Sequence, residues 1–170
     1  QTAFTGEMNA KQRYVAFAQR ADREGYPGVA RLFRACARAE QVHANEHVHA
    51  IAWTGREARA VLERLGVGTT AENLRSAIES ETYEVTQFYP ALLERARSDH
   101  QPMAVRSLTF ALSAEREHVG LLTAALASLD QRPPARPIYV CPFCGKTVES
   151  LDFRKCPNCF TGAKKFIKES

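Results

Sequence analysis

The chain has 170 residues, 45% of them hydrophobic and 25% charged, and its formal net charge at pH 7 is +4. This composition is typical of a globular protein with one ordinary domain, or one domain and a small appendix. Basic residues are interspersed with acidic ones, which argues against nucleic-acid binding, and no apolar run reaches the ~20 residues needed to cross a bilayer. Because residues 1–14 also lack a signal-peptide pattern, we expect a cytoplasmic protein with no nucleic-acid or membrane partner.

Helical patterning dominates residues 1–130. A Gly-Tyr-Pro-Gly turn separates the first two predicted helices, a capping-box pattern from Thr69 to Glu72 begins the third, and Pro102 begins the fourth. Pro90 falls inside the third helix and should kink it. The expected helical ranges are 2–24, 29–53, 69–98 and 102–129.

The connection over residues 54–69 is much longer than the other two, and we expect its residues 58–65 to be partly helical. Short first and last connections place successive helices antiparallel, whereas a long middle connection can pass from one end of a bundle to the other. The predicted fold class is therefore mainly α: a ferritin-like four-helix bundle with a long crossover between helices 2 and 3.

The sequence changes character after residue 130. Residues 131–137 contain three prolines and are predicted to be a semi-extended linker. Residues 138–170 are short of helical periodicity and carry four cysteines in two Cys-x-x-Cys pairs. We therefore predict a second, small domain, with a core built from Tyr139, Phe143, Phe153, Phe160 and Phe166.

The two cysteine pairs indicate a metal site in a reducing compartment, because a disulfide framework would usually spread its cysteines along the chain. Two such knuckles form a tetrahedral sulfur site for zinc or for a single iron, and the spacing alone does not choose between them. The predicted ligands are Cys141, Cys144, Cys156 and Cys159.

Carboxylates interrupt the apolar stripes of the predicted helices. On the fourth helix, steps of three and four residues give an apolar seam with Glu115 and His118 at its middle. Charged groups are almost never buried without a partner, and several facing glutamates would repel one another. A pair of divalent cations removes that conflict, and oxygen and imidazole ligands suit iron or manganese.

The candidate ligands also form an internal repeat. Ala39-Glu40-x-x-His43 recurs 75 residues later as Ala114-Glu115-x-x-His118, and Glu7 and Glu81 precede the two copies by 33 and 34 residues. This is the template of di-metal carboxylate bundles, in which two helices give one Glu and two give Glu-x-x-His. Glu84 is an extra carboxylate outside the repeat. His47 is interpreted as a packed or hydrogen-bonded histidine, with metal ligation as the alternative, and Cys36 as a small core residue.

In the order and combination of these motifs, the chain resembles rubrerythrin over essentially its whole length. The Tyr-Pro pair inside the third helix belongs to that family pattern. The matching segments are Phe4-Thr5-Gly6-Glu7, Ala39-Glu40-x-x-His43, Glu81-x-x-Glu84 with Phe88-Tyr89-Pro90, Ala114-Glu115-x-x-His118, and the two cysteine knuckles.

The resemblance implies two irons between the helices, with Glu84 and His43 exchanging on one iron as its oxidation state changes. It also implies tyrosines that hydrogen-bond near the site and a rubredoxin-like iron on the four cysteines. The implied roles are Glu40 and Glu115 as bridges, Glu7 and Glu84 on one iron, Glu81 and His118 on the other, and Tyr14 and Tyr89 beside them.

Members of the family are typically homodimers, in which the cysteine-bound iron of one subunit lies near the di-iron site of the other, and some members exchange helices between subunits. The resemblance therefore implies a homodimer. Two features depart from rubredoxins: Phe160 stands where glycine is usual, and only eleven residues separate the knuckles. Neither feature removes a ligand.

The function expected from the resemblance is a peroxidase of oxidative stress defence that reduces hydrogen peroxide to water. Electrons would arrive from an electron-donor protein or reductase and pass through the cysteine-bound iron. Alternatives are a di-iron oxidase or ferroxidase that uses O2 to handle iron, and a non-redox module with zinc on the cysteines and a structural metal pair.

Overall fold

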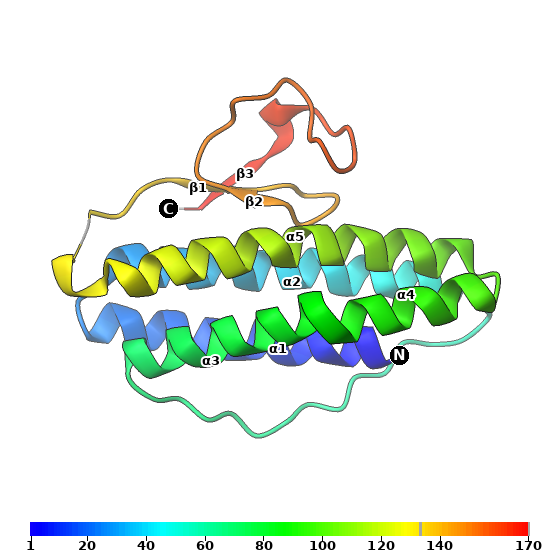
Figure 1. The fold of residues 1–170 in the computed structure, drawn as a ribbon, viewed down its shortest axis with the longest axis horizontal. Helices are drawn as coiled ribbons and strands as arrows, with labels where there is room; N and C mark the ends of the chain where they lie inside the picture. The colour runs from blue at the N-terminus through cyan, green and yellow to red at the C-terminus, as the bar shows by residue number, and fades with distance from the viewer. Residues whose placement is uncertain (133, 170) are drawn as a thin grey trace.

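The computed structural model describes residues 1–132 and 134–169. Four long helical segments form a bundle, and a small lobe at the C-terminal end of the chain lies across it (Figure 1). The third segment consists of two α-helices joined by a π-helical turn. The helices of the bundle are α1 (Thr2–Arg23), α2 (Pro27–Ala52), α3 (Thr70–Tyr83), η1 (Glu84–Phe88), α4 (Tyr89–Ser98) and α5 (Pro102–Ala127).

Local sequence signals set most of the helix boundaries. Pro27 and Pro102 occupy the first positions of α2 and α5, where the missing N–H would have no partner in the helix. The capping box at α3 is formed as predicted: the Thr69 hydroxyl accepts from the Glu72 N–H, and the Glu72 carboxylate accepts from the Thr69 N–H at 2.8 Å. The observed bounds therefore lie close to the expected ones.

The irregularity predicted at Pro90 takes the form of the π-helical turn η1. The Tyr89 N–H donates to the Glu84 carbonyl, five residues back instead of four. This wider turn ends just before Pro90, which has no N–H to give and stands in the first turn of α4. The turn also places Glu84 at the start of an irregular segment rather than on a regular helix face.

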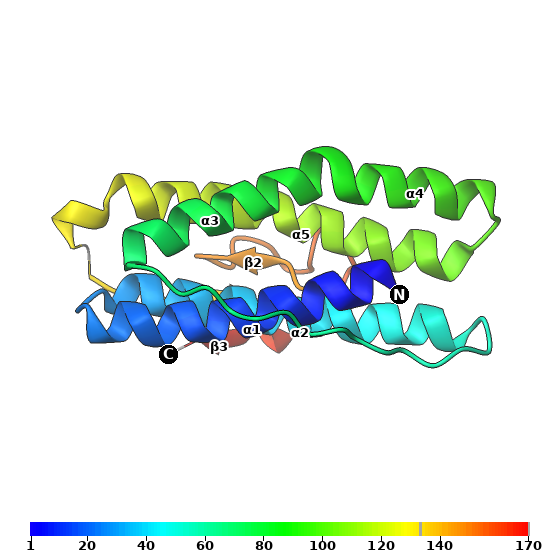
Figure 2. The ribbon, with the colours of Figure 1, turned by 90° about the horizontal axis from the view of Figure 1, so that it is seen from below.

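The connection between α2 and α3 crosses the whole length of the bundle, as Figures 1 and 2 show. The expectation of helix over residues 58–65 is wrong, because this stretch is extended along α1. Its backbone is satisfied by α1 side chains: the Asn9 amide donates to the Val61 carbonyl at 3.1 Å and accepts from the Glu63 N–H at 2.9 Å. These long-range bonds replace the hydrogen bonds of a helix.

Two apolar clusters flank the centre of the bundle. One contains Phe17, Phe33, Leu74 and Leu122, and the other is built around Tyr89 with neighbours on α4 and α5. Cys36 is fully buried in the first cluster, as expected of a small core residue. The polar residues of the predicted metal site lie between the two clusters, so that packing on both sides holds them in place.

The lobe consists of a three-stranded antiparallel sheet in the order β2-β1-β3 and two cysteine-bearing turns. β1 packs against α2 and β2 packs against α5, and Ile138 and Val140 of β1 join the first apolar cluster of the bundle. The remaining elements are η2 (Leu129–Gln131), β1 (Ile138–Val140), β2 (Thr147–Val148), η3 (Ala163–Lys165) and β3 (Ile167–Glu169).

The expected aromatic core of the lobe is only partly formed. Phe166 is buried and packs on Phe153, but Phe160 is 74% exposed, so its assignment to the core is wrong. Phe143 is also exposed in large part and packs against Phe110 of α5 rather than inside the lobe. In residues 1–132 and 134–169, no helix is long and apolar enough to cross a membrane.

Candidate metal centres

The structure brings six of the predicted ligands together at the middle of the bundle. They form two overlapping groups whose ligand atoms all lie within 4.8 Å of one another. Glu40 and Glu115 belong to both groups, as bridging ligands would. One group adds Glu7 and His43, and the other adds Glu81 and His118.

The helix geometry explains this convergence. Glu40 and His43 are three residues apart on α2, and Glu115 and His118 are three apart on α5, so each pair projects from one face of its helix. The two Nδ1 atoms point into the cluster: His43 Nδ1 lies 2.9 Å from Glu115 Oε1, and His118 Nδ1 lies 2.6 Å from Glu115 Oε2.

The donor set fits two divalent cations. All six residues are 1% exposed or less, yet several of their side-chain atoms lack a hydrogen bond of good geometry within the described chain. A buried carboxylate without such partners is costly, and bound cations would satisfy these oxygens. The unpaired atoms are one oxygen each of Glu7, Glu40 and Glu81, both oxygens of Glu115, Nδ1 of His118 and, on the side of the lobe, Nε2 of His43.

The pKa shifts of the cluster show the same conflict of charges. Burial and the neighbouring carboxylates Glu40 and Glu81 raise the pKa of Glu115 well above its usual value. Burial acts in the same direction on Glu7, but the adjacent His43 and His47 outweigh it and leave the Glu7 pKa below its ordinary range. The pKa of His43 is raised despite burial, because Glu115 and Glu7 surround it. In the protein alone these groups must share protons, whereas cations would let the carboxylates ionise.

Glu84 lies apart from the two groups. Burial, together with Glu81 and Glu7, raises its pKa well above the usual value of a carboxyl group. It begins the π-helical turn η1, where its backbone carbonyl accepts from the Tyr89 N–H. In this structure His43, and not Glu84, is therefore the fourth member of the group that contains Glu7.

Two buried tyrosines support the carboxylates from outside. The Tyr14 hydroxyl donates to Glu81, and the Tyr89 hydroxyl donates to Glu7. Burial raises the pKa of both phenols, with a further contribution from the carboxylate that each one meets. Both tyrosines therefore remain protonated hydrogen-bond donors at neutral pH.

His47 lies one helical turn beyond His43 and is outside both groups. Its Nδ1 is 3.1 Å from the Ser107 hydroxyl, and its Nε2 is 3.5 Å from the Tyr89 hydroxyl and 3.6 Å from Glu7 Oε1. It is therefore a buried, hydrogen-bonded neighbour of the site. The two remaining histidines, His49 and His100, are at the surface.

The four cysteines of the lobe form a third, separate group with ligand atoms within 4.8 Å of one another. The Sγ atoms of Cys141 and Cys159 are 3.5 Å apart, and those of Cys144 and Cys156 are 3.6 Å apart, with all four thiols free. A tetrahedral ion with metal–sulfur bonds of about 2.3 Å has sulfur–sulfur edges of roughly 3.8 Å. The spacing therefore fits one four-coordinate ion.

The cysteine lobe touches both histidines of the carboxylate cluster. His118 Nε2 is 3.1 Å from the Thr147 hydroxyl, which itself donates to the Gly145 carbonyl at 2.9 Å. His43 Nε2 faces Gly145 so closely that a Cβ on this residue would lie 2.1 Å from it. Each histidine thus turns Nδ1 to the carboxylates and Nε2 to the loop that follows Cys144.

Three of these neighbours have no individual signal in the sequence. Gly145 is visible only as the glycine of a cysteine knuckle, and its φ of +75° suits that turn. Thr147 and Ser107 reach the histidines from positions 29 and 60 residues away in the chain. Only the tertiary fold shows that they belong to the site.

Comparison with known proteins agrees with this geometry. The family model described as rubrerythrin matches residues 1–126. Rubrerythrin-2 of Clostridium acetobutylicum is 32% identical over 97% of this chain and 91% of its own length. Nigerythrin of Nitratidesulfovibrio vulgaris is 34% identical over 93% of this chain and 78% of its own length.

Solved structures show the same fold. Fully reduced, all-ferrous nigerythrin superposes with a TM-score of 0.90 at 34% identity, covering 98% of this chain and 83% of its own. A Mycobacterium tuberculosis bacterioferritin shares the bundle alone, with a TM-score of 0.67 at 23% identity over 75% of this chain and 81% of its own. The ferritin-like bundle, the carboxylate cluster and the four-cysteine lobe together show that this chain belongs to the rubrerythrin family.

Proposed function

We propose that the protein is a di-iron peroxidase that reduces hydrogen peroxide to water, with a cysteine-bound iron as its electron relay. The observation that carries this proposal is the contact between the two centres, because the loop after Cys144 packs on both histidines of the carboxylate cluster. A structural zinc knuckle has no need of such a contact, whereas an electron relay needs a short path. The related nigerythrin structure is described as all ferrous, which supports iron in both sites of this chain.

The ligands follow from the two groups at the bundle centre. Glu40 and Glu115 would bridge, Glu7 with His43 or Glu84 would hold one iron, and Glu81 with His118 would hold the other. When bound, the two irons supply the two electrons that break the O–O bond, and the cysteine-bound iron returns electrons singly.

The chain's own residues fix the geometry around this chemistry. Tyr14 and Tyr89 donate to Glu81 and Glu7, which orients these carboxylates and stabilises their charge. Thr147 accepts from His118 Nε2, which leaves Nδ1 free for a metal. Glu84 is placed on the irregular turn η1, where it can move toward the cluster in exchange for His43 with little change elsewhere.

The rival proposal is a di-iron oxidase or ferroxidase that uses O2, since the ligand set alone does not choose the oxidant. An electron-relay lobe favours the peroxidase, because an iron-storage protein draws its electrons from the stored metal. From the family we further propose that a donor protein or reductase supplies the electrons and that the protein forms a homodimer. In such a dimer the lobe of one subunit would approach the carboxylate cluster of the other. In the single chain, the lobe lies on its own bundle.

The test uses protein loaded anaerobically with iron and fully reduced. It is mixed rapidly with hydrogen peroxide or, separately, with air-saturated buffer, and the visible thiolate-to-iron absorption is followed. Fast reappearance of this absorption with peroxide and slow reappearance with O2 are expected. Equal or faster reaction with O2 would favour the oxidase, and metal-bound protein without the absorption would contradict the relay.

A further inference from the structure

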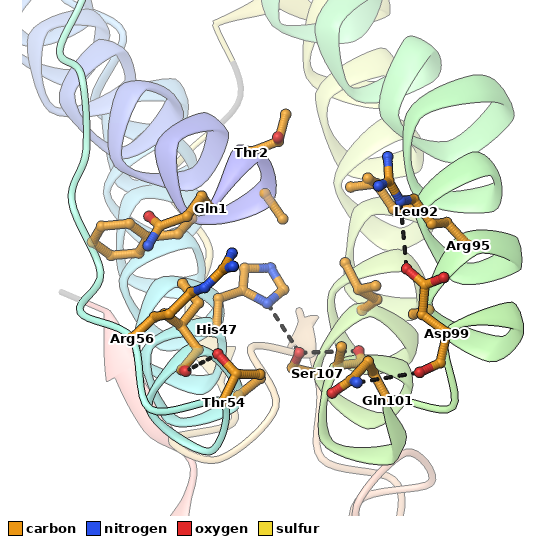
Figure 3. Close-up of a pocket in the computed structure, with 17 residues that line it drawn as sticks. Gln1, Thr2, His47, Thr54, Arg56, Leu92, Arg95, Asp99, Gln101 and Ser107 are labelled. Atoms are coloured by element: carbon orange, nitrogen blue, oxygen red, sulfur yellow. Dashed lines mark hydrogen bonds and ion pairs between the residues drawn. The ribbon is translucent and has the colours of Figure 1, made fainter.

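A cavity of about 320 Å³ opens at the end of the bundle where α1 begins and α2 ends (Figure 3). It lies between the α1–α2 pair and the α4–α5 pair. At its outer edge are exposed polar side chains, with Arg56 and Arg95 on opposite sides in Figure 3. We refer to it as the end cavity.

The walls of the end cavity are mainly apolar. Phe4, Ile51, Leu92 and Leu108 line it together with several alanines. Its volume is about ten times the ~30 Å³ share of one water molecule, and about twice the ~150 Å³ of an apolar cavity that takes up benzene. Hydrogen peroxide does not require such a space, whereas an organic molecule of about ten non-hydrogen atoms would fit it.

The inner end of the cavity is formed by His47 and Ser107, which lie next to the carboxylate cluster. His47 and Ser107 line it, are each 3% exposed, and are joined by a hydrogen bond from opposite helix pairs. On its other side, His47 Nε2 is 3.5 Å from the Tyr89 hydroxyl and 3.6 Å from Glu7 Oε1. One side chain therefore separates an apolar cavity from a predicted ligand of the metal pair.

From this arrangement we propose that the end cavity binds the organic part of a small hydroperoxide and that His47 and Ser107 form a gate for its O–O group. The inference rests on the proposed peroxidase function. When bound, the reduced metal pair would supply the two electrons that break the O–O bond of the hydroperoxide, and two protons from the solvent would complete one alcohol and one water molecule. The gate opens when His47 turns away from Ser107, which leaves the peroxide end of the molecule beside Glu7 and Tyr89.

The first measurement is binding of the product alcohol, which cannot react. Full-length protein loaded with zinc in both sites is titrated with cumyl alcohol, followed by ligand-observed NMR and calorimetry. Ala104→Phe places a ring in the cavity, and Ala124→Phe makes the same change on α5 at the opposite end of the bundle. Wild type and A124F are expected to bind, with affinity reduced at least tenfold in A104F.

The second measurement separates substrates in the iron-loaded protein. The ratio of kcat/KM for cumene hydroperoxide to that for hydrogen peroxide should fall at least tenfold in A104F and stay the same in A124F. Wild type that reduces hydrogen peroxide, but neither binds cumyl alcohol nor reduces cumene hydroperoxide, would overturn this inference alone. An unchanged ratio in A104F would also overturn it. Protein that reduces neither peroxide would overturn the proposed function, and the hydroperoxide assignment with it.

Discussion

The histidines at the bundle centre each serve two partners. Nδ1 of His43 and of His118 points to the carboxylates, while Nε2 meets the lobe at Gly145 or Thr147. The hydrogen bond between His118 Nε2 and Thr147 fixes both the tautomer and the plane of that imidazole, whereas His43 Nε2 packs closely on Gly145 and has no hydrogen-bond partner among the described residues. Small changes in the loop after Cys144 should therefore alter the orientation of the two histidines at the metal pair.

Gly145→Ala is the most direct test of this contact. A Cβ would lie 2.1 Å from His43 Nε2, and the φ of +75° also disfavours alanine, so the loop must move away. Because small misplacements between reacting centres are costly, the peroxide-driven return of the thiolate-to-iron absorption should slow by about 10- to 100-fold.

The control for this prediction is Gly162→Ala in the same lobe. A Cβ at Gly162 would meet nothing within 4 Å, and its φ of −60° suits alanine. G162A should react at the wild-type rate with the same absorption spectrum. A wild-type rate in G145A would show that this contact does not contribute to electron delivery.

Phe160 stores backbone strain in the second knuckle. Its φ is +62°, close to the +75° of Gly145 in the first knuckle, and its ring is 74% exposed. An L-residue in this conformation costs about 1–2 kcal/mol, so Phe160→Gly should stabilise the lobe by about 1 kcal/mol. Guanidinium unfolding, followed by the metal–thiolate absorption, measures the change.

Phe160→Ala separates the backbone from the ring. It removes the aromatic group but keeps a Cβ at positive φ, so its stability should stay near that of wild type. Equal gains in F160G and F160A would mean that the exposed ring, and not the backbone, was unfavourable.

At the scale of elements, two irregular segments set the site apart from a regular four-helix bundle. Glu84 is the first residue of the turn η1, and the extended connection between α2 and α3 runs along the outer side of α1. Both segments satisfy their backbone in unusual ways, through an i→i−5 bond in the first and through side chains of α1 in the second.

Asn9 holds the extended connection from a buried position. Its buried amide donates to Val61 and accepts from Glu63. Asn9→Ala leaves those two backbone groups without partners, so we expect a loss of about 1–3 kcal/mol. Urea unfolding gives the free energy, and hydrogen exchange should show faster opening over residues 54–69.

Gln12→Ala is the matched control, because Gln12 meets the same connection only through a 3.5 Å contact to the Glu63 carbonyl. Its effect should remain within about 0.5 kcal/mol. Losses of equal size in N9A and Q12A would argue against a special role of the buried amide.

Glu24 links the end of α1 to the start of α3. Hydrogen bonds from Thr70 lower its pKa from 4.5 to about 2. A carboxylate with a depressed folded-state pKa stabilises above its unfolded value near 4.5, and this contribution is lost as the pH falls through about 2. Glu24→Gln should therefore lower the unfolding free energy most above pH 5, and the difference from wild type should shrink between pH 4.5 and 2. A difference that does not vary with pH would contradict this assignment.

The sequence predicted the regular elements well because their signals are local. Pro27, Pro102 and the Thr69–Glu72 box fix helix starts without reference to the rest of the fold. The extended course of residues 58–65 was missed because it depends on Asn9, more than fifty residues away. The contact of Gly145 with His43 was missed for the same reason, since it joins two segments that the sequence presents as separate domains.

In the whole molecule, bundle and lobe share one interior. Ile138 and Val140 of β1 pack in the larger apolar cluster of the bundle, and Lys146 of the lobe pairs with Glu117 of α5. The folding of the two parts is therefore expected to be coupled. Loss of metal from either centre should weaken both.

Metal removal tests this coupling. At 100-fold excess over its dissociation constant, an ion contributes about 2.7 kcal/mol, and each kcal/mol moves the melting temperature by about 2–4 °C in a chain of this size. Dialysis against a chelator should thus lower the Tm by about 5–10 °C for each ion removed, and zinc should restore the Tm without restoring redox activity. If removal of the cysteine-bound metal leaves the melting temperature of the bundle unchanged, the two parts melt independently.

The docked lobe also has a consequence for the order of assembly. Helices α1 to α5 leave the ribosome before the four cysteines of the lobe, so the bundle can begin to fold while His43 and His118 are still uncovered. Once Gly145 and Thr147 settle on them, that face is closed to incoming ions. Ions that arrive before the last forty residues are made would meet both histidines uncovered, whereas later ions would find that face covered by the lobe.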